Sequence, residues 1–427
     1  MSRWAALNNH PPFAAVLTPH GPNTLFARRR NGILWPQHRR TARTDCGRRS
    51  VSRAIAEVLL SLIFFALIFD SGGELGIRIY AVVLLILLSV AQFEQLQVYP
   101  RELLIWSAAL TLMVPSFFAS VLKSIPFETI AVWTFPILVF PLVLAAVRAN
   151  RMTVDQFING GLLFALVILT LFYGRLNQID QISVVHDYLA ERSAGFFNEK
   201  KVFFENAMPV VYFQGTLALV MCAVLAIGRS RYVTYAIVCT ALLVAPSRFG
   251  LLLSLLFGFL MLTIKYRQRP AFWLLLGLVL ASGLYVAHSL PDSFVEIFSS
   301  EGEGSRIRLL HFSSVMDLFD QKPYILLTGD GPGTTFFSKG FGEMTDNIEI
   351  SQLEVLRKFG MPFTIALTIF LGTICYRLLR RRYHSIALAI IAHYVVALSN
   401  PVLFALPAIF LFAIAISTLQ SKRRPHA

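Results

Sequence analysis

Apolar stretches alternate with polar connectors along most of the chain. Twelve such stretches can be distinguished, and a run of about 20 apolar residues is long enough to cross the hydrocarbon core of a bilayer. We expect membrane-spanning helices near residues 54–69, 76–93, 103–121, 127–147, 157–173, 207–227, 232–245, 250–264, 271–288, 359–376, 385–398 and 402–419. The pattern therefore predicts an all-α, polytopic integral membrane protein with about 12 transmembrane helices.

The charges in the connectors predict the orientation of these helices. Basic residues gather in alternate connectors and at both ends of the chain, in residues 1–53, 148–151, 229–231, 265–269, 377–382 and 422–424. All of these segments fall on one side of the membrane if the N-terminus is cytoplasmic, which agrees with the positive-inside rule. We therefore expect both termini to be cytoplasmic. Because the basic residues follow this pattern, membrane orientation accounts for the net charge of +14, and the charge does not indicate a nucleic-acid partner.

This topology divides the chain into four parts. Residues 1–53 are rich in Pro and Arg and are expected to form a disordered cytoplasmic arm. Residues 54–288 hold the first nine spans together with an outer loop at 174–206. Residues 289–356 form a large outer loop, and residues 357–427 hold the last three spans and a basic cytoplasmic tail.

Composition supports a membrane protein and offers no metal centre. Hydrophobic residues make up 56% of the chain and charged residues only 15%, whereas soluble domains carry about 25% charged residues. The four cysteines are scattered, and no spacing among them suggests a metal site or a disulfide framework.

Arginines on the outer side are the exceptions to the charge pattern. Arg248 lies in a tight break between two apolar spans, where an unpaired guanidinium would cost several kcal/mol. It can snorkel to lipid phosphates, or it can bind an anionic group of a lipid-linked substrate, because a planar guanidinium fits phosphate oxygens. Arg192, Arg306 and Arg308 can add to the same clamp if the outer loops fold over it.

The large outer loop contains two further features. A helix-like stretch at 305–319 begins with Arg306 and Arg308. A tight turn follows at 328–334, where Gly331 and Gly333 belong to a group of glycines that lets the backbone approach another group closely. The turn lacks the Gly-Lys-Ser/Thr ending of a nucleotide-binding loop, and it can equally be a simple turn.

Four segments in this order resemble the O-antigen ligase and polymerase (Wzy-like) superfamily of bacterial membrane glycosyltransferases. They are RSAGFFN at 192–198, SRFGLL at 247–252, GDGPG at 329–333 and EISQLEVLRKFG at 349–360. The resemblance covers most of the chain from the first span onward. It implies a GT-C-type fold with a large periplasmic loop domain and a lateral, lipid-facing cleft.

One departure from the family pattern favours polymerases over ligases. Ligases of this family carry a His-Asn pair where this chain has Glu349 and Ile350. The 349–360 segment and the closing SNPVLF at 399–404 look most like polymerases of exopolysaccharide or capsule clusters. A carboxylate can also deprotonate an acceptor hydroxyl, so Glu349 is the expected base. The alternative for Glu349 is an acidic residue that merely stabilises a helix N-terminus.

The resemblance implies a polymerase that joins polyprenyl-diphosphate-linked oligosaccharides at the periplasmic face of the bacterial inner membrane. We expect Arg248 and Glu349 to be catalytic, and Arg192, Arg248, Arg306, Arg308, Gly331 and Gly333 to bind the diphosphate or the glycan. No cofactor, metal or nucleotide is expected. The expected partners are the lipid-linked oligosaccharide and membrane lipid, with a chain-length regulator protein as a further candidate. The alternatives are a ligase that moves finished glycan to another acceptor and a multi-pass transporter.

Overall fold

The computed structural model describes residues 41–72, 75–92, 98–191, 195–196, 201–203, 206–208, 211–245, 247–274, 277, 303–348 and 350–421. The chain forms two units, Met1–Ser52 and Arg53–Ala427. Apart from the first turns of α1, which begins at Thr41, the features described below belong to the second unit.

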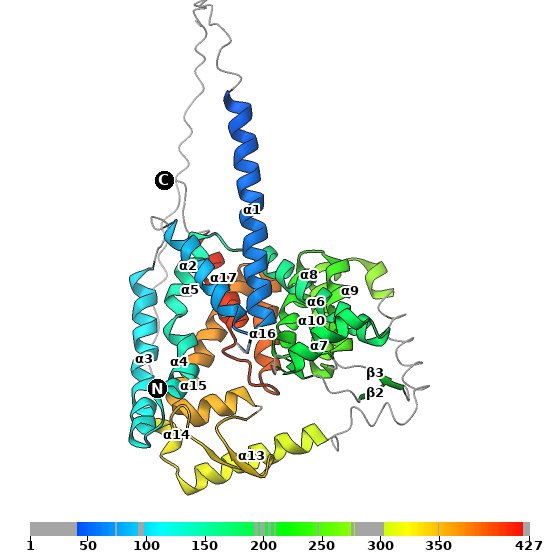
Figure 1. Ribbon diagram of the computed structural model, residues 1–427. Coiled ribbons are helices and arrows are strands. Elements are labelled where there is room, and N and C mark those ends of the chain that lie inside the picture. Colours follow the sequence, from blue (N-terminus) through cyan, green and yellow to red (C-terminus); the bar gives the residue numbers. More distant parts are fainter. Residues whose placement is uncertain are drawn as a thin grey trace, which may run out of the picture. The chain divides into compact units, whose positions relative to one another are not determined.

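The described chain is almost entirely helical (Figure 1). Its helices are α1 (Thr41–Phe69), α2 (Ile77–Val90), α3 (Pro100–Leu122), α4 (Phe127–Leu138), α5 (Phe140–Ala149), α6 (Val154–Leu176), α7 (Asp180–Glu191), η2 (Gln214–Leu217), α8 (Ala218–Gly228), α9 (Tyr232–Val244), α10 (Arg248–Tyr266), α13 (Glu303–Gln321), α14 (Ile325–Thr328), α15 (Ser351–Arg380), α16 (His384–Val396) and α17 (Leu406–Ser421).

Short antiparallel strand pairs are the only β-structure in the described residues. β1 (Gly195–Phe196) pairs with β4 (Tyr212–Phe213), and β2 (Lys201–Phe203) pairs with β3 (Asn206–Met208). β5 (Phe336–Ser338) and β6 (Glu343–Thr345) form a hairpin between α14 and α15. The prediction of an all-α protein is therefore confirmed at the level of fold class.

The predicted span at 271–288 lies mostly outside the described residues. Every other predicted span overlaps at least one described apolar helix. By length and composition, four of these described helices can cross a bilayer: α3, α6, α10 and α15. A fifth crossing is possible where α4 and α5 meet at a bend of 41°. The remaining apolar helical segments, among them Ala54–Phe69 within α1, have 10–17 residues, which is shorter than a typical span of about 20. The protein is thus a helical, membrane-embedded protein.

Some predicted boundaries are wrong. The segment predicted as a span from 207 contains strands β3 and β4 first and becomes helical only at Gln214. The last residues of the arm that we expected to be disordered are helical, because α1 begins at Thr41. For the large loop, expected to end at 356 before a span near 359, the structure shows α15 beginning at Ser351 with a break at Gly360. In contrast, the predicted helix at 305–319 is confirmed as α13.

The core of the helical unit is built around α8. Its residues from Ala218 to Ile227 are all buried, and α6, α9, α10 and α16 pack against it. Nearby, the ring of Phe64 in α1 meets Phe157 of α6 at 5.3 Å and Phe410 of α17 at 5.7 Å between centroids. Aromatic edge-to-face contacts of this kind hold together helices that are far apart in the sequence.

A polar cluster fixes the first turn of α3. Arg148, at the end of α5, donates to both carboxylate oxygens of Glu102, and the Arg148 Nη1–Glu102 Oε2 distance is 2.8 Å. Gln420, near the end of α17, bonds to both partners. Because each charge is largely removed from solvent, this paired arrangement avoids the cost of isolated buried charges.

Replacing a buried ring should destabilise the helical unit far more than replacing an exposed one. Phe64→Ala removes a fully buried ring between α6 and α17 and should cost about 3–5 kcal/mol. Phe118→Ala is the matched control, because Phe118 in α3 is 64% exposed. Thermal unfolding of the purified protein in detergent measures the difference. Equal melting temperatures for the two variants would contradict the packing described.

Candidate functional site

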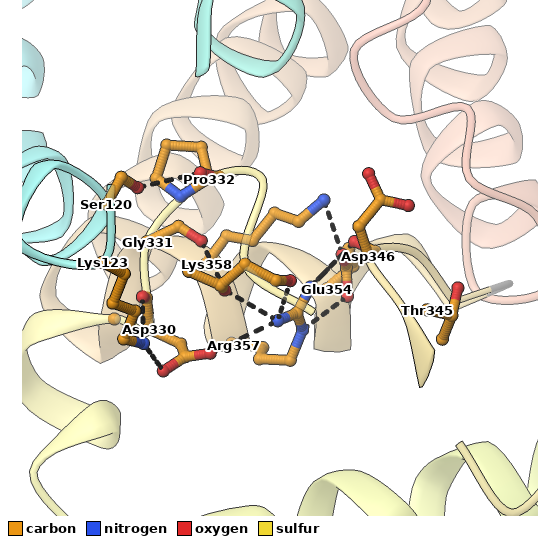
Figure 2. Close-up of polar contacts among 12 residues, drawn as sticks. Ser120, Lys123, Asp330, Gly331, Pro332, Thr345, Asp346, Glu354, Arg357 and Lys358 are labelled. Atoms are coloured by element: carbon orange, nitrogen blue, oxygen red, sulfur yellow. Dashed lines mark hydrogen bonds and ion pairs between the residues drawn. The ribbon is translucent and has the colours of Figure 1, made fainter. Parts of the chain in front are cut away.

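A buried charge cluster joins the segment between α13 and α15 to two membrane helices. The 303–348 segment contains α13, α14, a glycine turn at 329–333 and the β5–β6 hairpin. The turn lies against the end of α3 and the first part of α15. The described charged residues there are Lys123, Asp330, Asp346, Glu354, Arg357 and Lys358 (Figure 2).

A break in α15 creates the docking surface for the turn. Gly360 has non-helical torsions (φ 80, ψ 170), and Pro362 has no backbone N–H to donate. The carbonyls of Arg357 and Lys358 are therefore released from the helical hydrogen-bond pattern. Asp330 N donates to Arg357 O at 2.7 Å, and Gly331 N donates to Lys358 O at 3.1 Å. The kink thus binds the turn through backbone atoms.

The glycines of the turn are required by close packing against the protein itself. Gly331 has φ +100, and a Cβ there would lie 2.4 Å from Ser120 Oγ and 2.9 Å from Ser116 O. Gly333 has φ +82, and its Cβ would lie 2.7 Å from side-chain atoms of Ile125 and Thr129. The predicted close backbone approach is present, and the groups approached are the end of α3 and the start of α4.

Side chains of α3 hold the other side of the turn. Ser120 Oγ donates to Pro332 O at 2.8 Å. Lys123, the C-cap residue of α3, forms an ion pair with the Asp330 carboxylate and donates to Asp330 O at 2.9 Å. A cation at a helix C-terminus is also favoured by the helix dipole. The turn is therefore clamped between α3 and α15.

Arg357 is fully buried and uses every donor of its guanidinium. Nε and Nη2 bind the two oxygens of Glu354 at 3.0 and 2.7 Å, a bidentate pair. Nη1 donates to Thr334 O and Thr334 Oγ1 at 3.0 and 3.1 Å, and Nη2 donates to Asp346 O at 2.9 Å. Since all five N–H groups are satisfied, Arg357 joins the turn and the hairpin to α15 and has no donor left for a substrate.

Lys358 is also fully buried, but its ammonium group is not satisfied in the same way. Nζ lies 2.7 Å from Glu354 Oε1 as an ion pair. Apart from this ion pair, Nζ has no hydrogen-bond partner among the described residues. Its other neighbour is the ring of Trp133 in α4, whose centroid is 2.9 Å away. Lys358 is therefore a buried cation with donors still to fill.

A second buried pair lies between α13 and the hairpin. Ser338 Oγ accepts N–H groups from Gly340 and Phe341, both at 3.2 Å, and lies 2.7 Å from His311 Nδ1. With its lone pairs used in this way, the hydroxyl donates its proton to Nδ1, so the neutral His311 ring carries its own proton on Nε2. In this tautomer Nε2 already carries a proton and cannot accept another as a base. The His311–Ser338 contact is therefore a structural one.

The residues predicted for the site fall in separate parts of the structure. Arg248 is half-buried and is the first residue of α10, which packs against α8, α9 and α16. Arg306 is exposed and Arg308 half-buried on α13. Gly331 and Gly333 belong to the turn between α3 and α15. Arg192 and Glu349 lie outside the described residues.

Sequence reasoning assigned no role to Lys123, Asp330, Glu354, Arg357 or Lys358. For Glu354, Arg357 and Lys358 the sequence does contain a signal. Glu354 precedes the two cations by three and four residues, the spacing of ion pairs on one helix face. The sequence does not reveal that these pairs are buried. Their burial depends on the docking of a turn that is distant in the sequence.

No protein-family model matches the chain, and no curated protein matches its sequence. The resemblance to the Wzy-like superfamily therefore remains an expectation based on the four motifs.

The glycine turn should be more sensitive to substitution than an exposed glycine with similar torsions. Gly331→Ala introduces both a strained φ of +100 and overlap with Ser120, whereas Gly342→Ala introduces a φ of +72 into open space. Left-handed torsion alone costs an alanine about 1–2 kcal/mol, so Gly331→Ala should lower the melting temperature at least about twice as much as Gly342→Ala. Similar shifts in thermal unfolding would show that the turn is not clamped between α3 and α15.

Proposed function

We propose that this protein is a polysaccharide polymerase that joins polyprenyl-diphosphate-linked oligosaccharides at the periplasmic face of the bacterial inner membrane. The observation that carries the proposal is Arg248, the half-buried first residue of α10, a helix long and apolar enough to cross a bilayer. A guanidinium at the end of such a helix suits the diphosphate of a lipid whose tail stays in the bilayer. The order of the four sequence motifs supports the same family.

The proposed topology has about 12 spans in a GT-C-type fold, with both termini in the cytoplasm. Its support is the agreement between the described helices and the predicted spans, together with the basic residues of alternate connectors. In this orientation the 303–348 segment and the break before Arg248 face the periplasm. A chain-length regulator is a possible partner of that face.

The proposed reaction requires no nucleotide, because the lipid-linked donor is already activated. A hydroxyl oxygen of the acceptor glycan attacks the anomeric carbon of the donor and forms the new glycosidic bond. The bond between that carbon and the diphosphate oxygen breaks, and its electron pair leaves with polyprenyl diphosphate. Glu349 takes the hydroxyl proton. Arg248, assisted by Arg192, Arg306 or Arg308, stabilises the charge on the leaving diphosphate.

Two alternative functions, a ligase and a transporter, differ from the proposed polymerase in what they do to the substrate. A ligase would transfer a finished glycan to a second kind of acceptor, and the Glu349 in place of the ligase histidine argues against it. A transporter usually binds its substrate near the middle of the membrane. The largest described charge cluster instead lies at the end of α3, beside the 303–348 segment, which favours chemistry at the membrane face.

A reconstituted assay separates the three functions. Proteoliposomes containing the wild-type protein and lipid-linked repeat units, with no second acceptor, should produce longer lipid-linked glycans that gel electrophoresis resolves. Arg248→Ala and Glu349→Gln should each reduce elongation by about 100-fold or more, the usual range for loss of a charge-stabilising group or a base. Arg248→Lys should restore only part of the activity, because lysine lacks the bidentate fork.

Lys339→Met is the matched control, because Lys339 is an exposed residue of the 303–348 segment, paired with Asp317 at 2.5 Å. It should elongate glycans like the wild type. Elongation only after a second acceptor is added would identify a ligase, and solute movement without elongation would identify a transporter. Normal elongation by all three site variants would refute the site assignment.

A further inference from the structure

The open donors of Lys358 point to a binding site that the residues proposed so far do not include. Joining two lipid-linked glycans brings two diphosphates to the protein, and Arg248 belongs to a helix that packs with α8, α9 and α16. Lys358 lies instead among α3, α4 and α15, where Trp133, Phe359 and Phe363 belong to one hydrophobic cluster. This group of helices offers a second cationic position.

We propose that Lys358 Nζ binds the diphosphate of a prenyl lipid, with the Trp133 side chain covering the site when it is empty. The inference rests on the proposed function and extends it with a second diphosphate position. Its two supports are the buried ammonium without a hydrogen-bond partner among the described residues and the ring that closes over it.

The surroundings of Lys358 favour an added anion. Glu354 Oε1, its ion-pair partner, also accepts from Arg357 Nη2 at 2.7 Å, so one carboxylate serves two cations. Asp330 is engaged by Lys123. Asp346 is half-exposed and gives its backbone carbonyl to Arg357, and its carboxylate lies near enough to attract the Lys358 ammonium. A buried ammonium with unfilled donors is costly, and phosphate oxygens would fill them with charge-assisted hydrogen bonds.

The covering helix provides a route from the membrane. α4 is a short helix that meets α5 at a bend of 41°. Its Phe127, Val132 and Phe135 are exposed apolar residues, as expected for a surface in contact with lipid tails. Moving Trp133 aside would therefore open Lys358 toward the bilayer. This geometry favours a diphosphate attached to a lipid over a free one.

The test uses the purified full-length protein in detergent with farnesyl diphosphate as the probe. Inorganic pyrophosphate and farnesol are the comparison ligands. Calorimetry measures affinity, and tryptophan fluorescence reports on the surroundings of Trp133. The variants are Lys358→Met and Trp133→Phe, and Lys339→Met is the control because Lys339 is exposed and paired with Asp317.

The wild type should bind farnesyl diphosphate at least about tenfold more tightly than either comparison ligand, and Lys358→Met should lose about tenfold or more, the effect of removing a charged hydrogen-bond donor. Lys339→Met should match the wild type. Trp133→Phe should keep its affinity within about threefold, since a ring is retained, but should lose the fluorescence response seen in the wild type.

Unchanged affinity in Lys358→Met, or a fluorescence response that persists in Trp133→Phe, would overturn this inference and leave the proposed function standing. The Trp133→Phe result decides the matter if Lys358→Met does not fold. Equal affinity for pyrophosphate and farnesyl diphosphate would overturn the lipid assignment. A wild-type protein that binds no prenyl diphosphate would overturn the proposed function as well.

Discussion

The buried guanidinium of Arg357 is the interaction on which the arrangement of the 303–348 segment depends. It binds Glu354 in its own helix, Thr334 at the end of the glycine turn and the Asp346 carbonyl beyond the hairpin. Removing one partner from such a buried pair usually costs about 3–5 kcal/mol, because the other charge is left uncompensated. This single side chain thus connects α15 to two backbone carbonyls that lie 23 and 11 residues earlier in the chain.

The kink at Gly360 explains why the clamp forms at this point of α15. A regular helix would use the carbonyls of Arg357 and Lys358 internally, and the turn would find no acceptors there. Because Gly360 leaves the helical conformation and Pro362 has no N–H, those carbonyls accept from Asp330 and Gly331 instead. Two hydrogen bonds from the turn thus take the place of those that the broken helix lacks.

Helix α3 links this cluster to the opposite end of the helical unit. Its 23 residues correspond to a length of about 35 Å, slightly more than the hydrocarbon core of a bilayer. Glu102 in the first turn meets Arg148 and Gln420, and Lys123 at the C-cap meets Asp330. The charged contacts of α3 therefore lie at its two ends, with an apolar body between them.

The sequence predicted the helical class and most helix positions, because apolar runs and connectors are local features. It also predicted α13 and the glycine turn, where three glycines in five residues indicate close backbone approach. It could not show that Gly331 approaches Ser120, or that Arg357 is saturated while Lys358 is not. The first fact depends on contacts between residues more than 200 positions apart, such as Ser120 with Pro332. The second depends on how Thr334 and Asp346 lie against Arg357 and how Trp133 lies against Lys358. The charge pattern in the sequence made Arg248 the candidate ligand for a diphosphate. The burial of Lys358 in the structure adds a second candidate.

Hydrogen exchange at the amides of Asp330 and Gly331 tests most directly whether Arg357 holds the segment on α15. In the wild type these amides should be protected, since they donate to the carbonyls of the kink. Arg357→Met should raise their exchange and that of β5 and β6 by about 100-fold or more, corresponding to a loss of about 3–5 kcal/mol. The buried helix α8 should remain unchanged. Equal protection of the turn in the variant and the wild type would contradict the account.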